Sequence, residues 1–257
     1  MVSFKCASTP GHLQVSALSW DLDIQSHEEY LTIGLKINDA DCEVPTLGVQ
    51  WKTFTPFVYL PYWEFKSGGS INKSFTSITH WNWGELWMGE KVLSISKRDA
   101  YMRYIDLPKS TDVRFELATI IKSDDKSGDK DLLLSKGWNI VDSWEVAKSP
   151  TEYRQYVSNS YAEISCPKPI FRELKTGWIS DRSVCYLACG RPVLAENTGF
   201  SDYLPTGKGL LVFSNLEEAV ARVKEIENNY AYHANAAREL AENIFNSDQC
   251  LTKMLNL

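Results

Sequence analysis

The pattern of apolar and polar residues changes near residue 74. Before it, apolar and polar positions alternate weakly over Leu13–Asp21, Tyr30–Ile37 and Thr46–Tyr59, as in short strands. Prolines at positions 45, 56 and 61 favour extended segments over helix in the last of these regions. Lys66–Asn72 carries a Gly-Gly-Ser run and predicts a linker. Residues 1–65 therefore resemble the end of a domain rather than a whole one.

From residue 74 onward, apolar runs alternate with helical patterns. The predicted strands are Ser74–His80, Val113–Ile121, Trp138–Val141, Tyr161–Cys166, Pro192–Glu196 and Gly209–Phe213. The predicted helices are Lys97–Leu107, Asp131–Lys136, one opened by Ser149, one from Asp181 or Ser183 to Cys189, Ser214–Asn228 and Tyr230–Phe245. Strands that alternate with helices predict an α/β, Rossmann-like fold, in which a parallel sheet is covered by helices on both faces. This domain spans 66–257.

Single residues mark several of the predicted helix ends. Ser149 followed by Pro150 is typical of a helix start, because the serine side chain caps the helix and proline suits its first turn. Gly137 and Gly190 are typical of helix ends, since glycine adopts the left-handed conformation there. Pro108 is expected to end the helix that begins at Lys97.

Composition narrows the function classes. The chain has 257 residues, of which 44% are hydrophobic and 23% charged, which suits one large globular domain or two small ones. Its net charge of −6 argues against broad capture of nucleic acid, so an anionic ligand needs a local basic pocket. Without a membrane-length apolar run or the apolar core of a signal peptide, the sequence predicts a cytoplasmic protein.

The cysteines and acidic residues give no metal-binding pattern. Six cysteines are scattered through the chain without a C-x-x-C pair, and Cys185 and Cys189 are expected to be small buried apolar residues. Asp21-Leu22-Asp23 is a D-x-D triplet in the N-terminal third, and its surroundings do not resemble the end of a Rossmann strand. We therefore expect neither a metal site nor a cofactor.

The segment Gly177–Phe200 holds the best candidate for a ligand site. Ser180, Asp181, Arg182 and Ser183 open a predicted helix, and the start of a helix beside an arginine suits a phosphate. The crevice at the carboxyl ends of the strands is where open α/β sheets bind ligands. The alternative is that Asp181 only caps its helix and Arg182 makes an ordinary surface pair.

Loops at the ends of neighbouring strands supply further candidates. Asn197, Thr198, Gly199 and Phe200 follow a strand, and Gly199 would let the backbone approach a phosphate or sugar closely; a plain turn is the alternative.

Further acidic and aromatic positions complete the set of candidates. Glu196 ends a strand and is a candidate for a ribose hydroxyl, with Asp202 as a second choice. His80 and Trp81 follow the first strand of the domain and are candidates for sugar or phosphate contacts. His27 is a weaker candidate, and each of these residues has a structural alternative.

Part of this segment resembles a known family. Cys189-Gly-Arg-Pro-Val193, Asn197-Thr-Gly-Phe200, Gly209-Leu-Leu-Val-Phe213 and Leu216-Glu-Glu-Ala-Val220 are similar to a motif series of the C-terminal, donor-binding half of GT-B type glycosyltransferases. The close match covers about a third of the chain. A bacterial subset of that superfamily resembles Gly177–Val193 more closely, and in that subset a lysine precedes the segment at the place of Lys168.

The resemblance extends weakly upstream. The sequence departs from the family in its shorter N-terminal domain and in two missing glutamates. Residues 27–63 are similar to the end of the N-terminal acceptor domain and the crossing between domains in that subset, so 1–65 are expected to be a remnant of that domain. Retaining members carry two glutamates at the places that Gly177 and Cys185 occupy here. The usual carboxylate contacts to the donor ribose and sugar are therefore absent, and Asp181 and Arg182 would have to make them instead. The resemblance assigns no catalytic residue.

These observations predict a glycosyltransferase, or its donor-binding half, that transfers a sugar from a nucleoside-diphosphate donor to an unknown acceptor without a metal. The partners expected are the nucleotide-sugar and its acceptor, with a homodimer or another chain covering the aromatic residues of 1–65. The alternatives are a protein that binds nucleotide-sugars without turnover and a subunit that binds only another protein.

Overall fold

The computed structural model describes residues 27–46, 48–65, 68, 73–121 and 126–255, and the backbone of residues 4–7. The strand expected over Leu13–Asp21, the D-x-D triplet and most of the linker expected over Lys66–Asn72 lie outside these residues.

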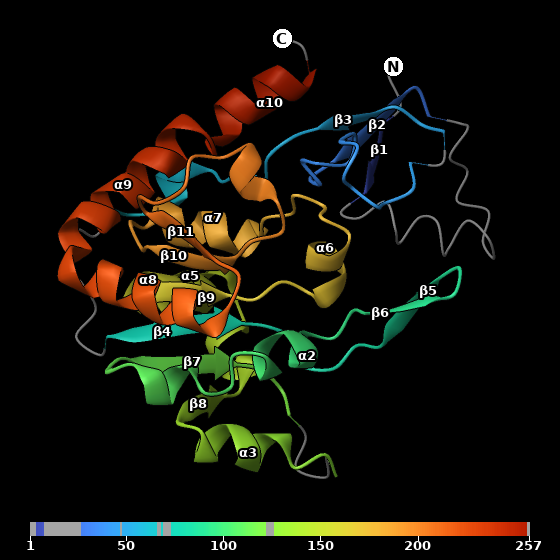
Figure 1. Cartoon of the computed structure of the whole chain (residues 1–257). Coiled ribbons are helices and arrows are strands. Elements are labelled where there is room, and N and C mark those ends of the chain that lie inside the picture. Colours follow the sequence, from blue (N-terminus) through green and yellow to red (C-terminus); the bar gives the residue numbers. More distant parts are fainter. Residues whose placement is uncertain are drawn as a thin grey trace.

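A six-stranded parallel sheet forms the centre of the molecule (Figure 1). Its strands are β4 (Ser74–Ile78), β7 (Arg114–Ala118), β8 (Trp138–Val141), β9 (Ala162–Ser165), β10 (Val193–Glu196) and β11 (Leu210–Phe213), in the spatial order β11-β10-β9-β4-β7-β8. All six correspond to predicted strands. The chain runs outward from β4 to β8 and then returns to β9 on the other side of β4. The topological switch point therefore lies between the carboxyl ends of β4 and β9.

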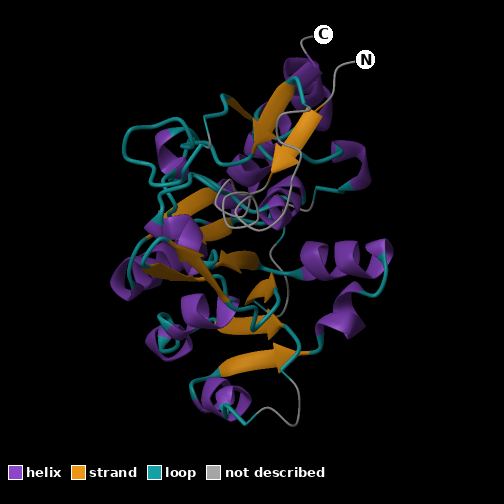
Figure 2. Ribbon diagram, turned by 90° about the vertical axis from the view of Figure 1, so that its right-hand side faces the viewer, coloured by secondary structure: helices purple, strands orange, loops and turns teal. Residues whose placement is uncertain are grey.

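Helices cover both faces of this sheet, as Figure 2 shows. They are α2 (Lys97–Met102), α3 (Asp129–Ser135), α4 (Ser143–Ala147), α5 (Pro150–Asn159), α6 (Pro169–Glu173), α7 (Asp181–Ala188), α8 (Leu216–Asn228), α9 (Tyr230–Asn243) and α10 (Ser247–Leu255). The buried residues of α2, α3 and α8 pack against one face, and those of α5, α7 and α9 pack against the other. Along β10, Leu194 joins the first of these clusters and Val193 the second, as strand geometry requires. The predicted fold class is confirmed.

Most of the residues predicted to mark helix ends do so in the structure. The Ser149 side chain accepts a hydrogen bond from the Glu152 amide, and Gly137 and Gly190 have φ angles of 94° and 70°. The helix expected over Lys97–Leu107 is wrong in its length, because α2 ends at Met102 and Pro108 lies in a 3-10 helix, η3 (Leu107–Ser110).

The early end of α2 has a packing reason. Tyr101, Tyr104 and Leu107 are each at most 1% exposed. Their spacing of three residues suits tight turns, which keep residues i and i+3 on one side. Tyr104 and Leu107 accordingly donate to carbonyls three residues earlier, at 2.9 and 3.0 Å.

A smaller parallel sheet precedes the large one, with strands β1 (Phe4–Ala7), β2 (Glu29–Thr32) and β3 (Trp51–Thr53). The strand expected over Tyr30–Ile37 ends at Thr32, where the Thr32 hydroxyl accepts from the Gly34 amide and the chain turns. The chain then crosses to the large sheet through residues 54–65, including η2 (Leu60–Tyr62). At this crossing Val58 donates to the Phe245 carbonyl at 2.8 Å and accepts from the Ser247 amide at 3.0 Å.

A hairpin not predicted from the sequence projects from the body between β4 and α2 (Figure 1). It consists of β5 (Glu85–Met88) and β6 (Lys91–Ser94) in antiparallel register. Leu93 packs into a cluster with residues of α6, while Trp87 and its cross-strand partner Val92 are exposed.

Candidate functional site

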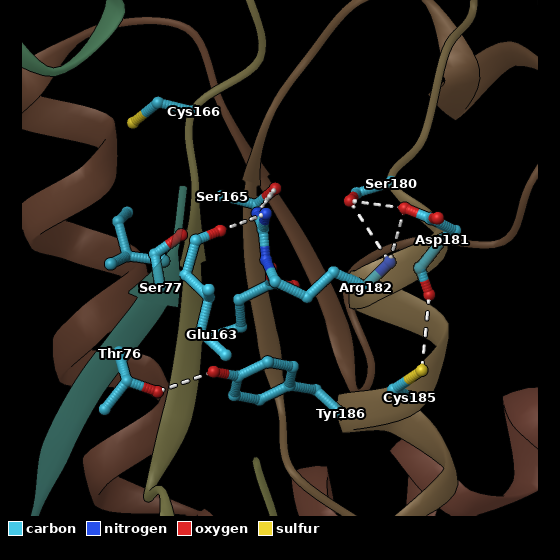
Figure 3. A network of polar contacts seen from close by, with 12 residues as sticks. Thr76, Ser77, Glu163, Ser165, Cys166, Ser180, Asp181, Arg182, Cys185 and Tyr186 are labelled. Carbon is cyan, nitrogen blue, oxygen red and sulfur yellow. Dashed lines mark hydrogen bonds and ion pairs between the residues drawn. The ribbon is translucent and has the colours of Figure 1, made fainter. Parts of the chain in front are cut away.

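Arg182 lies at the switch point between β4 and β9, and most of its hydrogen-bonding capacity is used inside the protein. Its Nε donates to Glu163 Oε1 at 2.6 Å and its Nη2 to Ser165 Oγ at 3.4 Å (Figure 3). Its Nη1 donates to the Ile78 carbonyl at 2.7 Å. The Arg182 side chain is 13% exposed and that of Glu163 is fully buried. Arg182 therefore ties the ends of β4 and β9 together, and its charge is balanced by Glu163.

The turn that opens α7 is capped by its own side chains. Ser180 Oγ and Asp181 Oδ1 accept from the Arg182 amide at 3.2 and 2.9 Å (Figure 3). The Ser183 amide donates to the Ser180 carbonyl at 3.1 Å. The Arg182 and Ser183 amides therefore have acceptors within the turn itself. Ser180 and Ser183 are buried, whereas the Asp181 side chain is exposed.

Three basic side chains nevertheless meet at one cavity beside this turn. The cavity has a volume of about 250 Å³ and is lined by Lys97, Lys168 and Arg182 together with Thr79, His80, Trp83, Trp178, Ser180 and Asp181. Lys168 Nζ lies 5.1 Å from the centre of the Trp83 ring, and burial lowers its pKa. Lys168, placed here by the family resemblance, is thus brought together with Arg182.

Lys97 was not among the residues predicted for the site. It is 8% exposed in the first turn of α2, its Nζ donates to the Cys166 carbonyl, and this nitrogen lies 5.5 Å from the centre of the Trp178 ring. Burial and the nearby charge of Arg182 lower the pKa of Lys97 to about 7. One feature of the sequence could have indicated that Lys97 is buried. Apolar Leu93 and Ile95, both buried in the structure, alternate with polar residues, and Lys97 is the next position in that alternation.

Two larger cavities adjoin the basic one and share part of its lining. A cavity of about 740 Å³ shares Ile78, Thr79, His80 and Arg182 with it, and is otherwise walled by Trp81, Asn82, Ile120, Ile121, Ser143, Trp144, Ala147 and Tyr153. On the other side, a cavity of about 420 Å³ shares Lys97, Lys168, Trp178 and Asp181, and adds Phe171 with Ile33, Pro56 and Phe57 from the N-terminal region. The three cavities follow the carboxyl edge of the sheet.

His80 and Trp81 differ in their availability. His80 is exposed, lines two of the three cavities and lies with its ring centre 5.4 Å from that of Trp83. Trp81 is 3% exposed, stacks on Tyr101 and donates from Nε1 to Asp129 Oδ2 at 2.9 Å. Trp81 therefore belongs to the core and contributes only one wall of the largest cavity.

Glu196 is not available to a ribose hydroxyl in this structure. Its side chain is 1% exposed, and its Oε1 is contacted by Arg103, by Tyr104 Oη at 2.8 Å and by Arg172 Nε at 3.4 Å. The alternative candidate, Asp202, is paired with Lys36 Nζ at 2.5 Å. Both carboxylates are thus engaged with basic groups of the protein.

The loop after β10 is also held by internal contacts. Asn197 Oδ1 accepts from the Gly199 amide at 2.9 Å, and Thr198 Oγ1 donates to the Trp178 carbonyl at 2.6 Å. Phe200 is 1% exposed in the core. Gly199 has a φ of 98°, and a Cβ there would lie 2.5 Å from Lys36 Cδ. The close approach expected at Gly199 therefore exists, but the approaching group is a lysine of the N-terminal region.

The remaining candidates lie away from the cavities. His27 precedes β2, with its ring 6.5 Å from that of Tyr30, and lines none of the cavities described above. Cys185, at the place of a family glutamate, lies within hydrogen-bonding distance of the Asp181 carbonyl, and burial raises its pKa to about 12. Among the described residues, no cluster of three His, Cys, Asp or Glu side chains is arranged to hold a metal ion. No helix in this part of the chain is both long and apolar enough to span a membrane.

No protein-family model and no curated protein matches the sequence. The fold is similar to that of solved structures. TarM matches 98% of this chain over 54% of its own length, with a TM-score of 0.58 and 13% identity. Anabaena HepE in complex with UDP and glucose covers 98% of this chain and 70% of its own, with a TM-score of 0.60 and 12% identity. The alpha-glucosyltransferase AGT in complex with UDP covers 98% and 71%, with a TM-score of 0.59 and 10% identity. The chain shares the fold of these proteins. It spans about half the length of TarM.

Proposed function

We propose that this chain supplies the donor-binding half of a glycosyltransferase that uses a nucleoside-diphosphate sugar. The observation that carries the proposal is the convergence of Lys97, Lys168 and Arg182 on one cavity at the switch point of a parallel sheet. Open α/β sheets bind ligands at this place, and buried cations without a full set of carboxylate partners favour an anion. The UDP bound to two proteins of similar fold supports a nucleotide as that anion.

The order of the cavities suits the order of groups in such a donor. The largest cavity has the apolar walls that a nucleoside requires, including the exposed Trp144. The basic cavity follows and suits the diphosphate. The third cavity, which Asp181 and Trp178 line together with Ile33 of the N-terminal region, suits the sugar and the approach of the acceptor.

The chemical role of the basic cavity is to stabilise the departing nucleoside diphosphate. Negative charge accumulates on the diphosphate as the glycosidic bond to it breaks, and preorganised cations lower the energy of that transition state. A charge-assisted hydrogen bond from Lys97 or Lys168 contributes about 1.5–3 kcal/mol. We propose that these lysines neutralise the diphosphate without a metal ion.

Asp181 is the remaining group with a defined chemical role in this scheme. It is the only carboxylate among the described residues that line the second and third cavities. We assign it to the hydroxyl groups of the donor sugar, since a carboxylate accepts such hydrogen bonds strongly.

Ligand-induced thermal stabilisation tests the proposal. UDP, GDP, dTDP and ADP, each with and without a sugar, are screened at millimolar concentration, because a ligand stabilises the folded state even when it binds weakly. We expect one nucleoside diphosphate to raise Tm and Lys97→Met to weaken its binding at least tenfold. Lys130→Met, at an exposed position of α3, is the matched control and should leave binding unchanged.

The same experiment contains the results that count against the proposal. Absence of stabilisation by every nucleotide would overturn it, and so would equal binding by the folded Lys97→Met variant and the parent protein. Release of free UDP from UDP-glucose in the presence of candidate acceptors separates transfer from binding alone.

A further inference from the structure

The loop that follows β2 reaches across to the segment that leads into α7, and Lys36 lies at that contact. Lys36 is 6% exposed, and its amide donates to the Thr176 carbonyl at 3.1 Å. Seven residues later, the Glu43 amide donates to the Leu174 carbonyl at 3.1 Å. Residues 34–43 therefore form an extended contact with the segment that leads into α7.

Two glycines make room for Lys36. A Cβ at Gly177 would lie 2.7 Å from the Lys36 amide nitrogen, and a Cβ at Gly199 would lie 2.5 Å from Lys36 Cδ. Both glycines have positive φ angles, of 69° and 98°. Gly177 and Gly199 carry no side chain, so the backbone at both positions can lie close to the aliphatic part of Lys36.

Three carboxylates hold the far end of the same side chain. Lys36 Nζ lies 2.5 Å from Asp202 Oδ2, 3.1 Å from Asp41 Oδ1 and 3.6 Å from Asp39 Oδ2. The hydrogen bond to Asp202 is the main cause that raises the pKa of Lys36 above its ordinary value. Asp39 and Asp41 belong to the N-terminal region and Asp202 follows β10, so the ammonium group joins the two regions.

The contacts continue from Lys36 to the basic cavity. The Gly177 amide donates to the Thr198 carbonyl at 2.9 Å, and Thr198 Oγ1 donates to the Trp178 carbonyl at 2.6 Å. The Trp178 ring stacks on Phe171 at 4.5 Å, and Lys97 Nζ lies 5.5 Å from its centre. Trp178 lines both the basic cavity and the adjoining cavity of about 420 Å³.

We propose that Lys36 is a positioning residue that fixes the Gly177–Trp178 wall at the sugar end of the donor site. This inference rests on the proposed function. Lys36 does not line the cavities that receive the donor and acts through Trp178. The nucleoside cavity lies on the other side of the basic cavity, so the effect of Lys36 falls on the sugar rather than on the nucleotide.

The test compares UDP with UDP-glucose in Lys36→Met, which keeps most of the aliphatic stem and removes the ammonium group. We expect the affinity for UDP-glucose to fall five- to tenfold and that for UDP to change less than twofold. Lys52→Met is the matched control, because Lys52 is an exposed lysine of the same region that is paired with Glu29 at 2.6 Å. That variant should bind both ligands like the parent protein.

A second variant separates positioning from general loss of structure. Asp202→Asn removes the closest carboxylate, and we expect it to reduce UDP-glucose affinity in the same selective way, with less than additive effects in the double variant. Equal losses for UDP and UDP-glucose in Lys36→Met, or additive effects of the two changes, would overturn the assignment. Failure of the parent protein to bind any of the four nucleoside diphosphates or their sugar derivatives would count against the proposed function itself, and the comparison is made with whichever diphosphate binds.

Discussion

Two buried lysines of this protein have opposite surroundings. Lys36 is 6% exposed and has three aspartates within 4 Å of its ammonium group, whereas Lys97 is 8% exposed and is hydrogen-bonded to a backbone carbonyl near two other cations. The pKa of the first is raised and that of the second is lowered to about 7. Carboxylates compensate the first cation within the fold, whereas our proposed function assigns the second to an anionic ligand.

Arg182 is intermediate between these two cases because it has one carboxylate partner. Removal of Glu163 would leave its charge uncompensated, like that of Lys97. Glu163→Met leaves a buried guanidinium without its carboxylate, and we expect the free energy of unfolding to fall by about 3–5 kcal/mol. Denaturant titration measures this change. Glu145→Met, at a side chain that is 76% exposed, is the control. Recovery of most of the stability in Glu163→Met/Arg182→Met supports the interpretation, and a loss as large as in the single variant contradicts it.

Lys97→Met should change stability in the opposite direction. Without a ligand, Lys97 is an uncompensated buried cation, and its replacement by an apolar side chain of similar length should raise the free energy of unfolding by about 1–3 kcal/mol. The same denaturant titration at pH 7, with Lys130→Met as the reference, measures it. A loss of stability in Lys97→Met would show that the hydrogen bond to the Cys166 carbonyl outweighs the burial of charge.

The lowered pKa of Lys97 makes the free energy of unfolding depend on pH. Its folded-state pKa is about 7 and its unfolded value 10.5. The unfolded state therefore binds more protons between these values, and this lysine destabilises the fold progressively as pH falls from about 10.5 to 7 and by a constant amount below that.

A bound diphosphate changes the protonation state that the site favours at Lys97. It favours the protonated lysine, so nucleotide binding takes up a proton above pH 7, and affinity should fall by up to about tenfold per pH unit there. Calorimetry in buffers of different ionisation enthalpy measures the proton. Proton uptake that persists in Lys97→Met assigns it to another group.

The smallest effect is expected at Trp83. Its ring centre lies 5.1 Å from Lys168 Nζ and the residue is 62% exposed, so the cation–π contact contributes about 0.5–1 kcal/mol. Trp83→Ala should weaken nucleotide binding two- to fivefold, and Trp83→Phe should restore most of it. Trp87→Ala, at an equally exposed position of the hairpin, should change nothing in an isothermal titration.

The sequence was informative where structure is local. Ser149, Gly137 and Gly190 marked helix ends correctly, and the alternation of strands and helices from residue 74 predicted the six-stranded sheet. The hairpin β5–β6 was missed, although Gly89 in a two-residue turn between alternating segments is a signal for one.

The site was harder to predict because its contacts are long-range. Ser180–Ser183 was expected at the crevice along the carboxyl ends of the strands, but no local pattern showed that Glu163 would neutralise Arg182 from 19 positions away. Lys97 meets the Cys166 carbonyl across 69 positions, and Lys36 meets Asp202 across 166. Only the folded chain shows which of these cations has a carboxylate partner.

Val58 connects the crossing segment to the end of the chain, since its amide and carbonyl bond to residues on either side of the start of α10. Val58 also packs in the buried cluster that contains Phe245 and residues of α7 and α9. A rotation of the small sheet therefore leaves both bonds intact when the chain bends between β3 and Val58, and the start of α10 then stays with the large sheet.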